Sequence, residues 1–149
     1  MFKKPQWLAL LLAFSLNSFA IDGLIDVASK HSFEDTADNL EKILLSNGMT
    51  VFARVPHSSD AQKIGIELQP VELIIFGNPQ VGGKLMQCAK TVAIDLPLKA
   101  LVWQDEDDQV WISYNDPVYL KERHNITGCD IQLNNISGAL DKLTAAAAN

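Results

Sequence analysis

The chain has 149 residues, and its 12 Lys and Arg against 18 Asp and Glu give a formal net charge of −6. Arg54 and Arg123 are the only arginines, so no basic patch is available to neutralise phosphates. This balance disfavours nucleic-acid binding and docking on anionic lipid.

The N-terminal segment, residues 1–20, has the pattern of a signal peptide. Lys3 and Lys4 precede an apolar run from Trp7 to Leu16, and Ser18-Phe19-Ala20 places small residues where a signal peptidase cleaves. The run of about ten residues is half the length of a membrane-spanning helix, and no cysteine follows it as a lipid attachment point. We therefore expect a periplasmic or secreted protein that starts at Ile21 and has no stable membrane anchor after cleavage.

The remaining 129 residues have the length of a single domain, residues 21–149, with a net charge of −8 after loss of the two lysines. Cys88 and Cys129 are its two cysteines. An even number in an oxidising compartment favours a disulfide, which would stabilise the fold by about 4 kcal/mol at most. Two free thiols and metal ligation remain as alternatives.

The first half of the domain is expected to contain a strand over residues 21–28 and a helix that Ser32 caps. Phe33, Ala37, Leu40 and Leu44 form the apolar face of this helix. Asn47-Gly48 ends the helix, and the strand Thr50–Val55 follows. Ser58-Ser59-Asp60 is expected to cap a short helical turn that runs through Ile64, before a buried strand at Glu72–Phe76.

The turn Gly77-Asn78-Pro79 stops that buried strand. We expect residues 80–84 to be flexible and a short helix to follow over 84–89. A glycine-rich turn after a strand can offer free backbone N–H groups to a ligand. A nucleotide-binding phosphate loop is excluded, because Lys84 stands one place late and Leu85 replaces the metal-binding hydroxyl.

The second half is expected to form a hairpin, a short helix and a long helix. Strands at 98–104 and 109–114 flank a solvated tip, Asp105–Asp108; a four-residue loop pairs Trp103 with Val110 and turns Trp111 to the opposite face. Pro117 opens a helix that reaches His124. The last helix starts near Asp130 and has an alanine-rich tail that is expected to fray. Its apolar stripe consists of Leu133, Ile136, Leu140 and Leu143.

No residue pattern identifies a catalytic or metal site. The three histidines lack the local spacing of a zinc site, and neither a nucleophile elbow nor an EF-hand loop is present. Asp95 and Asp116 each stand near a proline and are interpreted as turn formers. We assign no catalytic residue, metal or cofactor, and regard His57 and His124 as the better functional candidates because both follow turns or strand ends.

Several stretches, in order, resemble the domain-of-unknown-function 302 family. They are LIIFGNP at 73–79, Leu85-Met86, AIDLPLKALVW at 93–103, Val110-Trp111, SYNDP at 113–117, Val51-Phe52-Ala53 before His57, and Arg123-His124. Val55-Pro56-His57 departs from the family's Ile-Asp-His, which removes a carboxylate beside the histidine; Gly82-Gly83-Lys84 departs from Gly-Thr-Pro. The resemblance implies an α+β, two-layer, TBP-like β-α-β(4)-α fold with helices on one face of an antiparallel sheet, and makes a homodimer plausible. It implies no established activity.

Three hypotheses follow for the function. The first is a non-catalytic exported domain that binds a small polar ligand near His57, Asn78, Tyr114 and His124. The second is a module for dimerisation or partner interaction, and the third is an enzyme with a dispersed, histidine-containing site. An enzyme should place His57 or His124 within hydrogen-bond reach of a carboxylate or hydroxyl group in a pocket.

Overall fold

The computed structural model describes residues 22–149, so the predicted signal peptide lies outside the described residues. Within this range, no helix has both the length and the apolar character needed to cross a membrane. The elements are β1 (Leu24–Ala28), α1 (Phe33–Ser46), β2 (Thr50–Val55), α2 (His57–Lys63), β3 (Val71–Gly77), α3 (Pro79–Cys88), the 3-10 helix η1 (Lys90–Ile94), β4 (Leu98–Gln104), β5 (Val110–Asn115), α4 (Pro117–Arg123) and α5 (Asp130–Ala148).

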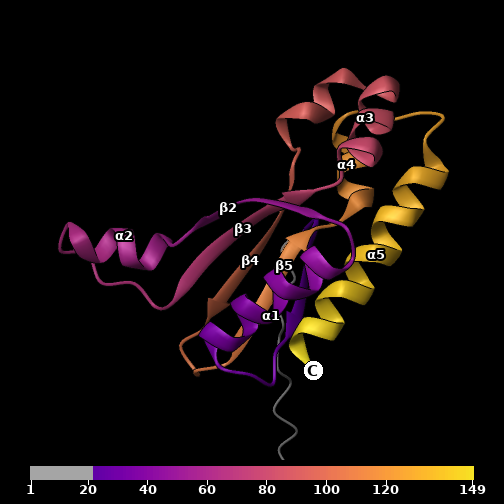
Figure 1. The fold of residues 1–149 in the computed structure, drawn as a ribbon. Helices are drawn as coiled ribbons and strands as arrows, with labels where there is room; N and C mark the ends of the chain where they lie inside the picture. The colour runs from indigo at the N-terminus through magenta and orange to yellow at the C-terminus, as the bar shows by residue number, and fades with distance from the viewer. Residues whose placement is uncertain (1–21) are drawn as a thin grey trace, which may run out of the picture.

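The five strands form one antiparallel sheet in the order β1-β5-β4-β3-β2. Helices α1 and α5 cover one face of this sheet, as Figure 1 shows. The predicted α+β fold and its β-α-β(4)-α order are therefore confirmed. The core between the layers is formed by Ile74, Phe76, Ala100, Val102, Ile112 and Tyr114 from the strands and by Ala37, Leu40, Leu44, Leu133, Ile136, Leu140 and Leu143 from the helices.

Helix α1 begins and ends where the sequence predicts. The Ser32 hydroxyl oxygen accepts a hydrogen bond from the Asp35 N–H at 3.1 Å, which satisfies one of the free donors of the first turn. At the other end, Gly48 adopts a positive φ of 76°, a conformation that glycine reaches without strain. The cap and the turn therefore fix the length of the helix.

The C-terminal tail does not fray as predicted. Helix α5 continues to Ala148, and Ala147 and Ala148 are fully buried. The Ala148 carbonyl oxygen accepts a hydrogen bond from the Lys30 N–H at 2.9 Å, which ties the last turn to the β1–α1 connection. The alanines thus give close packing against the body of the protein.

The β4–β5 hairpin has a register one residue away from the predicted one. Trp103 pairs with Trp111, and the two rings lie on the same face with centroids 6.3 Å apart. The reason is that the Asp105 N–H donates a hydrogen bond to the Gln109 carbonyl oxygen at 2.9 Å, which leaves a loop of only three residues, 106–108. In this loop Asp108 adopts a positive φ of 64°. Asp105 closes the loop, because its carboxylate accepts hydrogen bonds from the N–H groups of Asp107 and Gln109 at 2.9 Å each.

Asp105 also holds the tryptophan pair in place. Its second carboxylate oxygen accepts a hydrogen bond from Trp111 Nε1 at 2.8 Å. This bond, together with those from the backbone, lowers the pKa of Asp105. The acidic tip is therefore an ordered loop as well as a solvated one.

The connection between β2 and β3 projects from the body and carries α2 (Figure 1). The predicted cap at Ser58-Ser59-Asp60 is wrong: α2 begins at His57 after Pro56, without a side-chain cap. The Ser58 hydroxyl group instead bonds the N–H and carbonyl groups of Val71 at 3.2 and 3.3 Å. It thereby ties α2 to the first residue of β3.

Candidate functional site

An open apolar cavity lies at the end of the sheet where β3 ends and β4 begins. It has a volume of about 260 Å³. We call it the end cavity and define it by its lining residues: Met49, Phe52, Phe76, Gly77, Asn78, Pro79, Val81, Gly82, Gly83, Met86, Leu96, Pro97, Leu98, Asn135, Ile136, Ala139, Leu140 and Leu143. Its walls are therefore α3, α5, the ends of the two central strands and the start of β2.

Helix α3 forms the wall that the sequence did not predict. Residues 80–84 are helical rather than flexible, and the helix runs from Pro79 to Cys88. Asn78 Oδ1 accepts a hydrogen bond from the Gln80 N–H at 2.9 Å, and Pro79 supplies a preset φ at the first helical position. The cap and the proline together start a helix whose interior contains two glycines.

Those two glycines face the end cavity. Pro79, Gly82, Gly83 and Met86 all line it, and their spacing of three, four and seven residues places them on one side of the helix. A Cβ at Gly82 would lie 3.6 Å from Leu96 Cδ1, whereas a Cβ at Gly83 would meet nothing within 4 Å. The two glycines therefore add no side chain to the cavity, at a cost to the helix of about 1 kcal/mol per glycine relative to alanine.

The lining of the end cavity suits an apolar molecule. Among the described residues that form it, only Asn78 and Asn135 have polar side chains, and Asn78 Oδ1 is already bonded to the backbone of α3. An engineered cavity of about 150 Å³ in another protein stays dry and binds benzene. The end cavity, at about 260 Å³, is larger and can hold a ligand bigger than one aromatic ring.

The structure places the four predicted ligand residues in separate surroundings. Asn78 lines the end cavity, whereas His57 is exposed at the start of α2 on the projecting connection. The Tyr114 hydroxyl group donates a hydrogen bond to Asp141 Oδ1 at 2.7 Å, between β5 and α5. Burial, followed by this bond, raises the pKa of Tyr114.

His124 belongs to a polar cluster that joins η1, the following turn and α4. Its Nε2 atom lies 2.5 Å from Asp95 Oδ2, and its Nδ1 atom lies 3.0 Å from Thr91 Oγ1. The other oxygen of Asp95 accepts a hydrogen bond from Arg123 at 3.3 Å. The side chains of His124 and Asp95 are only 6 % and 13 % exposed. Sequence reasoning missed the roles of Asp95, which was interpreted as a turn former, and of Thr91.

A hydroxyl, an imidazole and a carboxylate in this order resemble the chain of groups that activates a nucleophile. None of the three, however, lines the end cavity. The residues after Asp95 do: Leu96, Pro97 and Leu98 form part of its wall, and the Leu96–Pro97 peptide bond is cis. The cluster therefore supports the turn that shapes the cavity. The only sequence signal for it was that AIDLP and Arg123-His124 belong to the same ordered set of motifs.

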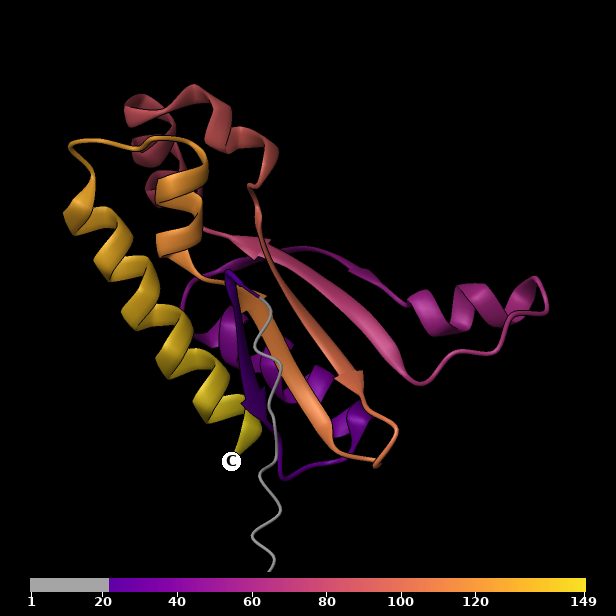
Figure 2. The same ribbon diagram turned by 180° about the vertical axis from the view of Figure 1, so that it is seen from behind.

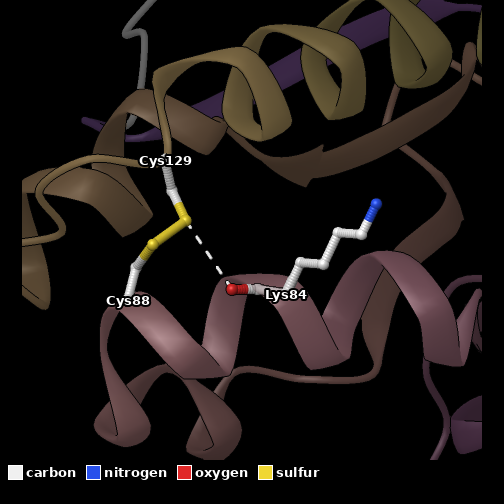
Figure 3. Close-up of a disulfide and its surroundings, with 3 residues drawn as sticks. All are labelled: Lys84, Cys88 and Cys129. Carbon is white, nitrogen blue, oxygen red and sulfur yellow. Dashed lines mark hydrogen bonds between the residues drawn. A yellow bond between two sulfur atoms is a disulfide. The ribbon is translucent and has the colours of Figure 1, made fainter.

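The predicted disulfide between Cys88 and Cys129 is present, with a Cα–Cα distance of 6.3 Å. Figure 3 shows that it joins the C-terminal end of α3 to the residue before α5. Cys129 Sγ lies 3.6 Å from the Lys84 carbonyl oxygen, a contact without a shared hydrogen because a disulfide sulfur has none. The bond links two walls of the end cavity. Within residues 22–149, no group of three or more His, Cys, Asp and Glu residues could hold a metal ion.

The family model described as "Domain of unknown function DUF302" matches residues 25–143. The chain belongs to the DUF302 family. A solved DUF302 structure from Bacillus stearothermophilus, of an uncharacterized conserved protein, has a TM-score of 0.69 at 22 % identity, and the match covers 86 % of this chain and 97 % of that one. This likeness shows the shared fold.

The chain is also similar to part of two longer proteins. The chain is 46 % identical over 104 residues to a fluoride-specific ion channel of Brucella suis biovar 1 (strain 1330), a match that covers 70 % of this chain and 41 % of that protein. A fluoride-specific ion channel of Brucella abortus biovar 1 (strain 9-941) matches at the same identity over 70 % of this chain and 38 % of that protein. The chain thus spans about two fifths of the length of these curated relatives.

Proposed function

We propose that this DUF302 chain is an exported, non-catalytic domain that binds a small, largely apolar molecule in the end cavity. The observation that supports the proposal most directly is the glycine pair of α3, which leaves open an apolar space that a side chain as large as leucine would narrow. The lining also changes the expected ligand from polar to apolar, because most of its side chains cannot form hydrogen bonds.

Export to the periplasm or the medium is part of the same proposal. The pattern of residues 1–20 supports it, as does a disulfide, which persists in oxidising compartments. An apolar metabolite has low solubility there, so a cavity that removes it from water would be useful for its retention or transfer.

A cavity-filling variant tests the binding proposal. We expect the neutral fluorescent probe N-phenyl-1-naphthylamine to bind the wild type at one equivalent with a dissociation constant of about 1–10 μM. Gly83→Leu should weaken this binding at least about 10-fold, because the new side chain enters the space beside Gly83. Gly83→Ala is the matched control: it should retain binding and raise the free energy of unfolding by about 1 kcal/mol through better helix propensity.

Two outcomes would count against the end cavity as the binding site. Equal probe affinities for Gly83→Leu and Gly83→Ala would place the probe elsewhere. A loss of binding in His57→Ala would do the same, since His57 lies on the projecting connection. Far-ultraviolet circular dichroism of each variant establishes that it is folded.

A second candidate function is a role beside a fluoride channel. It is supported by the 46 % identity to part of two proteins named as fluoride-specific ion channels. In this alternative, the chain acts as an accessory domain of a fluoride channel. Cells that lack the chain should then show fluoride-sensitive growth, measured beside a chloride control; unchanged growth would contradict this role.

A further inference from the structure

The projecting connection between β2 and β3, residues 56–70, exposes three large apolar side chains. We call it the arm (Figures 1 and 2). Ile64, Ile66 and Leu68 are 74 %, 50 % and 51 % exposed. Ile64 is the C-cap residue of α2, and the other two lie in the irregular segment that leads to β3. Single exposed apolar residues are ordinary, but three within five residues of one projecting connection are typical of a surface that contacts a partner.

The sheet has a second apolar surface on the face opposite α1 and α5. None of the described helices covers this open face, as seen in Figure 2. Strand register brings its large residues together, since Leu73 pairs with both Val55 and Leu101, and Trp103 pairs with Val71 and Trp111. We define the open face by Val55, Leu73, Ile75, Leu101, Trp103 and Trp111.

The polar atoms of the tryptophan pair are satisfied within the protein. Trp103 Nε1 donates a hydrogen bond to Ser113 Oγ at 2.7 Å, and the Ser113 hydroxyl group donates to Asp26. Trp111 Nε1 is bonded to Asp105. The outward parts of the rings are therefore free for apolar packing rather than required for hydrogen bonding.

We propose that two copies of this chain form a twofold dimer in which the arm of each copy packs on the open face of the other. The arm leaves the sheet from β2 and β3, which also carry Val55, Leu73 and Ile75 of the open face, so one rotation axis can bury both arms and both faces at once. Five strands about 4.8 Å apart and about 20 Å long give a face of roughly 480 Å² in projection. A stable interface needs about 800 Å² from each partner, so the face requires the arm to complete it.

The charge distribution favours contact through these surfaces. A processed chain with a net charge of −8 repels a second copy over most of its surface. On the sheet face opposite the helices, Lys99 and Asp26 are the charged residues of the strands and offset each other. On the arm, Asp60 and Lys63 form an ion pair at 2.7 Å, which leaves Glu67 as the unpaired charge. The two surfaces can therefore meet with little repulsion.

Sedimentation velocity on the processed chain at roughly 20 μM tests this dimer. The wild type should have twice the mass of one chain. Ile66→Asp on the arm and Leu101→Lys on the open face should each raise the dimer dissociation constant at least about 100-fold, because the twofold axis removes each contact twice. Ile131→Asp, at a residue 72 % exposed at the start of α5, is the matched control and should remain dimeric.

Mixing the two variants distinguishes the proposed arrangement from packing of face on face. The mixture should form a heterodimer. The native arm of the Leu101→Lys chain packs on the native face of the Ile66→Asp chain, and the second contact brings the introduced aspartate and lysine, which have opposite charges, together. A monomeric wild type, a dimeric Ile66→Asp variant or a mixture without heterodimer would each overturn the proposal. Ile66 is half exposed, so its substitution leaves the folding of the chain intact.

Discussion

Replacing both cysteines by alanine is expected to lower the free energy of unfolding by about 2–4 kcal/mol. Cys88 and Cys129 are 41 residues apart, and the bond between them restricts the unfolded chain. Alanine at both positions avoids leaving a reactive thiol and places no hydroxyl group at Cys129, which is 3 % exposed. Urea denaturation of the wild type and of Cys88→Ala/Cys129→Ala measures the difference.

The same variant should also bind the fluorescent probe less tightly, since the disulfide links α3 and α5, two walls of the end cavity. Dithiothreitol should bring the wild type to the stability of the variant and leave the variant unchanged. A difference in the free energy of unfolding below about 1 kcal/mol would show that the bond contributes little.

Mass spectrometry of the exported protein should find Ile21 as the first residue and no free thiol. An unprocessed chain with two thiols would contradict export.

Local sequence patterns were sufficient to predict α1 and the order of the elements. The spacing of Ala37, Leu40 and Leu44 specifies one buried helix face, and Ser32 acts on a donor three residues away. Such interactions operate within one element, so they can be recognised before the fold is known. The ordered family motifs then indicated the arrangement of the sheet.

Helix α3 was predicted too short because its local signals conflict. Gly82 and Gly83 disfavour a helix, whereas Asn78 and Pro79 start one. The conflict is resolved by the contact of α3 with the rest of the protein, including the disulfide at Cys88. The hairpin register was predicted wrongly for a different reason. Asp108 occupies a backbone conformation that is more common for glycine, which no local pattern indicated.

The polar cluster and the end cavity depend on contacts between distant parts of the chain. His124 and Asp95 are 29 residues apart, and no pattern near either one specifies the other. The end cavity combines residues from β2, β3, α3, β4 and α5. The sequence therefore identified Asn78 as a residue near a pocket. It could not predict that the pocket is apolar, because the lining depends on how these elements pack.

Arg54 is expected to give the second large effect on stability. It lies on the helix side of β2 and forms a two-bond contact with Glu72, at 2.6 Å from Nε and 2.9 Å from Nη2. Its Nη1 atom also bonds Asp38 and Glu41 at 2.7 and 2.8 Å. The hydrogen bond to Glu72, opposed by burial and assisted by the two other carboxylates, raises the pKa of Arg54. The arginine is charged at every pH at which the protein is folded.

Arg54→Met should lower the free energy of unfolding by about 2–4 kcal/mol. The variant retains the apolar stem but leaves the buried Glu72 without its cation, close to two further carboxylates. The range lies slightly below that for fully buried pairs, because the Arg54 side chain is 28 % exposed. Arg54→Lys should lose about 1–2 kcal/mol, since lysine keeps the charge but cannot bind Glu72 through two parallel bonds.

The double variant Arg54→Met/Glu72→Leu separates the value of the ion pair from the cost of leaving one charge alone. It should recover most of the stability lost in Arg54→Met, because replacing both members of a buried pair by apolar residues is often neutral. Urea denaturation of the four proteins in a double-mutant cycle measures this coupling. If the double variant were as unstable as Arg54→Met, the bonds of Arg54 to Asp38 and Glu41 on α1 would be the contacts that stabilise the fold. The cluster would then act mainly by holding α1 against the sheet.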